Sequence, residues 1–153
     1  MIEVLMEEDR WSEIGFEALA ERAVGAALHH LGLAPDAWEV SVLAGDDARI
    51  AALNKAFRAK EAPTNVLSWP SADRNGLPDP SEGPELGDIA LAYETCRAEA
   101  EASGLPFADH VAHLLVHGTL HLLGYDHEDD ADAERMEQTE TAILATLGIP
   151  DPY

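Results

Sequence analysis

The sequence has one cysteine, no long apolar run and few basic residues. Cys96 stands alone among 153 residues, so an internal disulfide is excluded, and we expect its thiol to pack as a small apolar group. No apolar run reaches the roughly 18 residues of a membrane span. The opening MIEVLMEEDR lacks the basic and apolar segments of a secretory signal. These absences favour a protein of the reducing cytoplasm with no membrane partner.

Basic side chains are far outnumbered by acidic ones. Nine Lys and Arg residues stand against 30 Asp and Glu residues, which gives a formal net charge of −21. Such a charge argues against non-specific binding to nucleic acid, which requires a positive field. The basic residues are concentrated, however, and four of the nine lie within 49–60: Arg49, Lys55, Arg58 and Lys60. A local basic site of this kind can hold an anion on an acidic protein.

Length and hydrophobic content indicate one globular domain, residues 1–153. Hydrophobic residues make up 46% of the chain, and strand-like patterns alternate with helix-length ones. We expect strands at 2–6, 38–43, 64–69 and 86–92. We expect helices from Ser12 to about Leu31, from Asp46 to about Arg58, at 93–103, at about 107–123, and from Asp129 or Asp130 onward. Residues 71–85, rich in Gly, Pro, Asp and Ser, are predicted to form a long exposed loop.

The order of these elements predicts the fold class. The pattern β-α-β-α-β-β-α-α-α is typical of an α+β fold in which a small mixed four-stranded sheet packs with about five helices as a single pair of layers. The last helix is expected to turn Met136, Ile143 and Leu147 toward the core. The sequence contains no internal repeat and no heptad array.

The most informative segment is HGTLHLLGYDH, residues 117–127. His117 and His121 are four residues apart, so on a helix they share one face and can bind one ion. Gly124 can adopt positive φ and turn the chain so that His127 folds back as a third ligand. Three protein ligands leave the fourth tetrahedral position open, which is the arrangement of a catalytic zinc site. We therefore predict one zinc ion per chain; the alternative is that these are hydrogen-bonded histidines inside a helix pack.

The ligand spacing is also that of the metzincin proteases, but one group is missing. Those enzymes carry a glutamate directly after the first histidine as general base, and this chain has Gly118 there. A zinc peptidase or amidase stays open as an alternative, as does a non-enzymatic protein whose zinc holds the fold. His113 forms another i,i+4 pair with His117 and is expected to lie behind the ligands or to line the cleft. Asp126 either orients a ligand imidazole, acts as a base, or only caps the turn.

Three segments together resemble the YbeY family of bacterial endoribonucleases. HGTLHLLGYDH is similar to the signature of that family, and LNKAFRAKEAPTNVLSWP (53–70) and LGDIALAYETCRAEA (86–100) are similar to two further segments. The three segments follow one another in the order of the family, and the likeness runs over about residues 40–147. It is weakest before Trp38 and in the 71–85 loop.

This resemblance implies a zinc-dependent cut in single-stranded RNA, with action on the 3′ end of small-subunit ribosomal RNA and on defective ribosomes. It assigns the zinc ligands to His117, His121 and His127, and a phosphate-binding arginine to Arg58. A guanidinium can grip a phosphate through two parallel hydrogen bonds. Candidate residues along the RNA path are Lys55, Lys60, Ser68 and His113. Ser68 is suggested by the resemblance alone.

Two questions stay open at this level. The attacking group is either water or the ribose 2′-hydroxyl, and no residue stands out as the general base. The acidic net charge favours guidance to the substrate by the small ribosomal subunit, through its proteins or an assembly GTPase.

Overall fold

The computed structural model describes residues 2–58, 64–71, 78, 83–125 and 129–153. The described residues form four strands: β1 (Ile2–Met6), β2 (Glu39–Gly45), β3 (Val66–Pro70) and β4 (Glu85–Ala92). They also form five α-helices: α1 (Phe16–His30), α2 (Asp47–Arg58), α3 (Tyr93–Ser103), α4 (Phe107–Leu122) and α5 (Asp130–Thr146). Short 3₁₀ helices span Asp9–Ile14 and Pro35–Ala37. No helix in these ranges is long and apolar enough to cross a membrane.

The strands form one mixed sheet in the order β1-β2-β4-β3. β1 pairs in parallel with β2, with Ile2 beside Val40, and β2 pairs in parallel with β4, with Val42 beside Ile89. β3 is antiparallel to β4 and places Ser68 beside Ile89. Helix α1 provides the crossover that the parallel pair β1–β2 requires. The expected α+β class with a mixed four-stranded sheet is confirmed.

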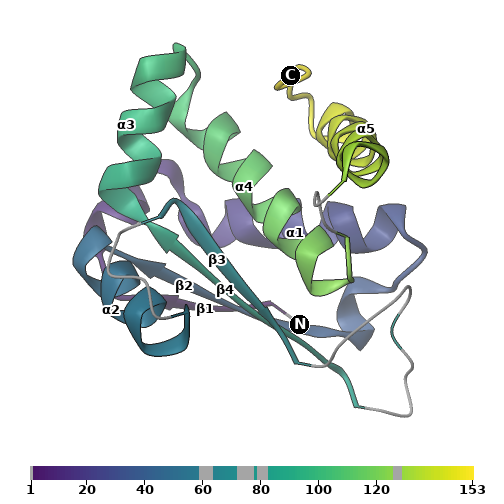
Figure 1. Ribbon diagram of the computed structural model, residues 1–153, viewed down its shortest axis with the longest axis horizontal. Coiled ribbons are helices and arrows are strands. Elements are labelled where there is room, and N and C mark those ends of the chain that lie inside the picture. Colours follow the sequence, from purple (N-terminus) through teal and green to yellow (C-terminus); the bar gives the residue numbers. More distant parts are fainter. Residues whose placement is uncertain (1, 59–63, 72–77, 79–82, 126–128) are drawn as a thin grey trace.

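One face of the sheet packs against α1 and α4, and α5 packs on these two helices (Figure 1). Side chains from every layer meet in this core: Val24, Val42, Ile89, Leu115 and Ile143 are each at most 1% exposed. The inward positions of α5 agree with the prediction for Met136 and Ile143, while Leu147 is half-buried at the end of the helix. Burial of this apolar surface provides most of the driving force that holds α4 against the strands.

Helix α2 packs against part of the opposite face of the sheet (Figure 1). Ile50 of α2 is fully buried in a second, smaller cluster with Leu67, Ala90 and Ala92. Successive strand residues point to opposite faces, which is why Ala90 contacts α2 while its neighbour Ile89 belongs to the main core. The pair of layers expected from the sequence is therefore extended by a partial third layer.

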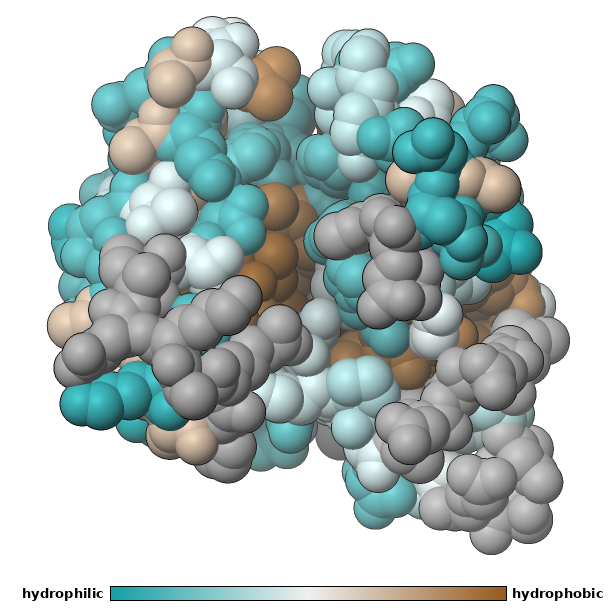
Figure 2. Space-filling model, viewed as in Figure 1, coloured by the Kyte–Doolittle hydropathy of each residue, from teal (hydrophilic) through white to brown (hydrophobic). Residues whose placement is uncertain are grey.

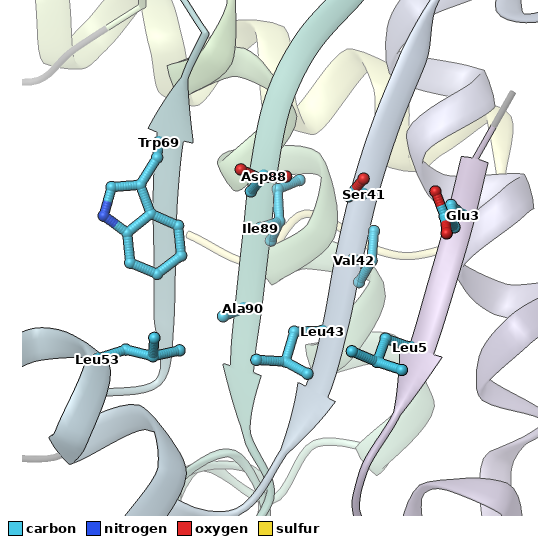
Figure 3. A pocket seen from close by; sticks show the side chains of 10 residues that line it. All are labelled: Glu3, Leu5, Ser41, Val42, Leu43, Leu53, Trp69, Asp88, Ile89 and Ala90. Carbon is cyan, nitrogen blue, oxygen red and sulfur yellow. The ribbon is translucent and has the colours of Figure 1, made fainter.

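Beyond α2, the same face of the sheet forms a cavity of about 490 Å³ (Figure 3). Its floor consists of two rows that run across the strands. Glu3, Ser41 and Asp88 stand side by side in one row, and Leu5 and Leu43 lie in the next. We call this surface the open sheet face.

The predicted start of the first helix was wrong. Ser12 does not cap α1; its hydroxyl donates to the carbonyl of Asp9 within the 3₁₀ helix, and α1 begins after Gly15, whose φ is 61°. The reason is Trp11, which is fully buried and donates from Nε1 to the carbonyl of Gly45 at 2.9 Å. Anchoring this indole in the core imposes a tight turn before α1, and Gly15 accommodates that turn with a left-handed backbone.

The predicted starts of two other helices are confirmed. Asp46 caps α2 by accepting from the backbone amide of Arg49, and Asp129 caps α5 by accepting from that of Asp132. Cys96 is buried within α3, and burial raises the pKa of its thiol, in agreement with its expected role as a small apolar group. Strand β1 spans the predicted residues 2–6, the boundaries of the other strands shift by at most two residues, and β3 ends at Pro70, at an edge of the sheet where proline is tolerated.

Candidate metal centre

The two sides of helix α4 differ in burial, and three of its histidines lie on the less buried side. The residues that face the sheet recur at helical spacing and are fully buried: Val111, Leu115, Gly118 and Leu122. His113, His117 and His121 follow one another at intervals of four residues on another side of the helix, and each is only partly buried. The helix therefore presents a row of imidazoles at the border between core and solvent.

His117 and His121 direct the same ring atom at each other. Their Nε2 atoms are 3.0 Å apart, and the ring planes meet at 81° with centroids separated by 4.5 Å. Two nitrogen ligands of one tetrahedral zinc ion, each at about 2.0–2.1 Å, lie about 3.3 Å apart. The observed separation is close to that value, so this pair of nitrogens fits a zinc ion with little rearrangement.

Glu140 of α5 stands behind this pair. Its side chain is 0% exposed, and Oε1 accepts a hydrogen bond from His117 Nδ1 at 2.8 Å. A proton held on Nδ1 leaves the lone pair of the neutral ring on Nε2, the atom that faces His121. A carboxylate that orients a histidine in this way is a recurring partner of metal-binding imidazoles. The donor set therefore fits a zinc centre in chemistry as well as in spacing.

Glu140 carries its negative charge at neutral pH. Burial alone would raise the pKa of Glu140, but hydrogen bonds from His113 and His117 outweigh burial and lower the pKa to about 2. An anion at this place favours a cation nearby. The carboxylate therefore contributes an electrostatic attraction for a metal ion as well as the orientation of His117.

His113 lies on the far side of Glu140 from the His117–His121 pair. Its Nε2 is 3.3 Å from Glu140 Oε2 and 3.1 Å from the hydroxyl of Tyr153. Its ring centroid is 6.4 Å from that of His117. Its place behind the proposed ligands and its use in RNA binding both stay predictions.

Several predicted site residues fall outside the described residues. His127 and Asp126 lie in 126–128 and Lys60 lies in 59–63, and the side chain of Arg58, the last residue of α2, is likewise outside the described part. Within the described ranges, no group of three potential ligands is arranged around one point. The roles predicted for these four residues therefore stay predictions. Gly124 does adopt the expected positive φ, 92°, just after α4.

Lys55 and Ser68 occupy different surroundings. Lys55 is exposed on α2. Ser68 is half-buried on β3 beside Ile89, and because Ile89 lies directly under Gly118, Ser68 is on the side of the sheet that α4 covers. That position is compatible with the predicted place of Ser68 in the cleft, whereas α2 packs on the other face.

The surroundings of Gly118 explain why no glutamate follows the first histidine, as one does in the metzincin proteases. A Cβ atom built at Gly118 would lie 3.2–3.4 Å from three side-chain carbons of Ile89, which is tighter than most such contacts. The position faces the sheet, so a glutamate there would enter the core and not reach the His117–His121 pair. The glycine serves close approach of α4 to β4, and the peptidase alternative loses its geometric support.

Sequence reasoning missed Glu140 and Tyr153. A signal for Glu140 was available, because Met136, Glu140 and Ile143 share one face of α5 at helical spacing and two of them are core residues. A glutamate at an inward position requires a buried partner. No comparable pattern singles out Tyr153, whose contact with Glu140 depends on how the chain turns after α5.

Polar residues surround the hollow between α3 and α5. Figure 2, seen from the same side as Figure 1, shows hydrophilic residues over most of this face and a hollow between the ends of α3 and α5.

His110, in the first half of α4, binds Glu99 of α3 through Nε2 at 3.0 Å. That contact is separate from the network around Glu140.

Comparisons with known proteins agree along nearly the whole chain. The family model described as "Endoribonuclease YbeY" matches residues 2–148. An endoribonuclease YbeY from Paracoccus denitrificans is 55% identical, with 99% of this chain and 89% of the relative covered. One from Dinoroseobacter shibae is 56% identical, with 99% and 90% covered. The solution structure of TM1509 from Thermotoga maritima matches with a TM-score of 0.65 at 25% identity, covering 94% of this chain and 87% of that one.

Proposed function

This chain belongs to the YbeY endoribonuclease family, and we propose on that basis that it cuts single-stranded RNA with the help of one zinc ion. The reaction is cleavage of a phosphodiester bond. The proposed cellular role is maturation of the 3′ end of small-subunit ribosomal RNA in the cytoplasm, together with removal of defective ribosomes. The observation that carries the zinc proposal is the 3.0 Å approach of two Nε2 atoms with a buried carboxylate behind one of them.

The proposed metal ligands are His117, His121 and His127. A zinc ion bound there supplies Lewis acidity toward water and toward phosphoryl oxygen atoms. Glu140 retains the proton on His117 Nδ1 and so keeps Nε2 available as a ligand atom. Because Glu140 is fully buried, it orients a ligand and does not itself reach the RNA.

Arg58 is proposed to hold the scissile phosphate. Lys55 and Lys60 are proposed to follow the neighbouring phosphates, and Ser68 and His113 to line the path of the RNA. The support is the concentration of cations in 49–60 within a chain of net charge −21. Since the rest of the surface repels polyanions, we propose that ribosomal proteins of the small subunit or an assembly GTPase bring the substrate to the enzyme.

A cleavage assay tests the proposed activity. Tag-free protein is incubated with a single-stranded RNA, with a duplex of the same sequence and with casein. We expect the single strand to be cut, the duplex to be cut much more slowly, and a chelator to reduce cleavage to background until zinc is restored. Casein is expected to stay intact. Casein cleavage with inert RNA would instead establish the peptidase alternative.

The ends of the RNA products identify the attacking group. A 2′,3′-cyclic phosphate arises only when the ribose 2′-hydroxyl attacks, whereas attack by water gives a linear phosphate directly. Mass spectrometry of the products at early times distinguishes the two routes.

Replacing Arg58 with alanine separates chemistry from folding. We expect the rate of RNA cleavage to fall about 10- to 100-fold, the worth of charge-assisted hydrogen bonds to phosphate, with zinc content and thermal unfolding unchanged. Arg49→Ala is the matched control, because Arg49 lies on the same helix in an exposed ion pair with Glu7. If Arg58→Ala loses zinc or stability but cleaves normally per folded molecule, Arg58 is structural.

A further inference from the structure

The chain folds back along α5 after that helix ends. Ile149 donates from its backbone amide to the carbonyl of Leu144 at 3.0 Å and packs against the main core. Asp151 then accepts two hydrogen bonds, one from the Thr141 hydroxyl at 3.3 Å and one from the Tyr153 amide at 2.9 Å. We call residues 148–153 the C-terminal segment. These contacts fix its course and bring its last side chain to the middle of α5.

The hydroxyl of Tyr153 reaches the buried carboxylate of Glu140. It lies 2.8 Å from Oε2 and 3.0 Å from Oε1, and 3.1 Å from Nε2 of His113. The Tyr153 and His113 rings meet edge to face, with centroids 5.4 Å apart. Burial and the charge of Glu140 raise the pKa of Tyr153, so the phenol keeps its proton and donates it to the carboxylate.

The two oxygen atoms of Glu140 therefore have different principal donors. Oε1 accepts from His117 Nδ1 at 2.8 Å, and Oε2 accepts from the Tyr153 hydroxyl at 2.8 Å. A carboxylate held at both oxygens cannot rotate freely about its last bond. Its plane then fixes the direction of the His117 ring, and with it the direction of the Nε2 lone pair.

We propose that Tyr153 is a positioning residue of the metal centre, which acts by holding Glu140 against His117. The inference rests on the proposed metal site and adds to it a residue from the C-terminal segment. Without the phenol hydroxyl, Oε2 keeps only longer contacts, such as that with His113 at 3.3 Å, and the carboxylate gains freedom to turn away from His117. The zinc affinity should then fall, as it does when an outer hydrogen-bond partner of a metal ligand is removed.

Tyr153→Phe tests this role by removing one oxygen atom. The protein carries no tag at its C-terminus, and zinc affinity is measured by competition with a chromophoric chelator. We expect the dissociation constant for zinc to rise about 10-fold, and the visible absorption bands of the cobalt-substituted protein to shift. The unfolding midpoint of the metal-free protein should stay close to that of the wild type, a result that a purely structural role would not give.

Two further variants complete the test. Tyr93→Phe is the matched control, because its hydroxyl contacts Glu13 on another part of the molecule, and it should bind zinc like the wild type. Asp151→Ala keeps the phenol but releases the C-terminal segment, and a loss of zinc affinity is expected there too. Unchanged affinity in Tyr153→Phe, or in Asp151→Ala if the first variant does not fold, overturns the inference. Failure of the wild type to bind zinc instead overturns the proposed metal site.

Discussion

Replacing His121 with alanine is expected to remove the metal ion and to lower RNA cleavage by more than about 100-fold, the upper end of the effect of losing an outer partner of a metal ligand. The reason is geometric, because the Nε2 atoms of His117 and His121 face each other at 3.0 Å and the substitution removes one of the three proposed ligands, leaving only His117 and His127. Zinc content per chain, measured by atomic spectroscopy after dialysis, and the cleavage rate should fall together.

His110→Ala is the matched control for this substitution. It removes an imidazole from the same helix, but His110 contacts Glu99 and not the Glu140 network. This variant should keep its zinc and its activity. The metal-free forms of wild type and His121→Ala should unfold at similar temperatures. If His121→Ala keeps a full equivalent of zinc and normal cleavage, the ion does not bind at the His117–His121 pair.

Replacing Gly87 with alanine is expected to cost more than about 3 kcal/mol of unfolding free energy. Gly87 has a φ of 142°, where L side chains are rarely found, and an added Cβ would lie 2.2 Å from the backbone carbonyl oxygen of Trp69. Neither atom can move without breaking the pairing of β3 with β4. Since small domains have only about 5–15 kcal/mol of stability, a loss of this size removes a large fraction of it and should lower the unfolding midpoint markedly.

Replacing Gly25 with alanine is expected to have the opposite effect on stability. Gly25 lies inside α1, and a Cβ added there would meet no atom within 4 Å. Alanine should therefore stabilise the protein by about 0.5–1 kcal/mol through helix propensity. Chemical denaturation of both variants beside the wild type gives the comparison. Equal stability of Gly87→Ala and the wild type would mean that the approach of β3 to β4 differs from that described.

The part of the site that sequence could predict is the part built by one helix. His117 and His121 are four residues apart, and the geometry of an α-helix alone brings such residues together. Their convergence on one point therefore follows once the segment is recognised as helical. The same holds for the caps at Asp46 and Asp129, which depend on hydrogen bonds to backbone amides within three residues.

The remaining parts depend on packing between elements distant in the sequence. Glu140 meets His117 only because α5 lies across α4, and Tyr153 meets Glu140 only because the C-terminal segment turns back. The spacing along α5 indicates that Glu140 points inward but does not identify His117 as its partner, and no local pattern marks Tyr153. The failed prediction at Ser12 has the same origin, since the short-range capping preference was overridden by a long-range bond from Trp11 to Gly45. The order of the elements along the sequence likewise could not predict that α2 packs on the second face of the sheet.

The open sheet face restricts how a nucleic acid can meet this molecule. Glu3 and Asp88 stand in its polar row, and the described residues that line it include no lysine or arginine to offset them. Phosphate groups are repelled from such a surface, most strongly at low ionic strength. A strand of RNA on its way to the histidines is therefore expected to bypass the row of Glu3 and Asp88, and the phosphate contacts proposed for α2 lie beside this row and not within it.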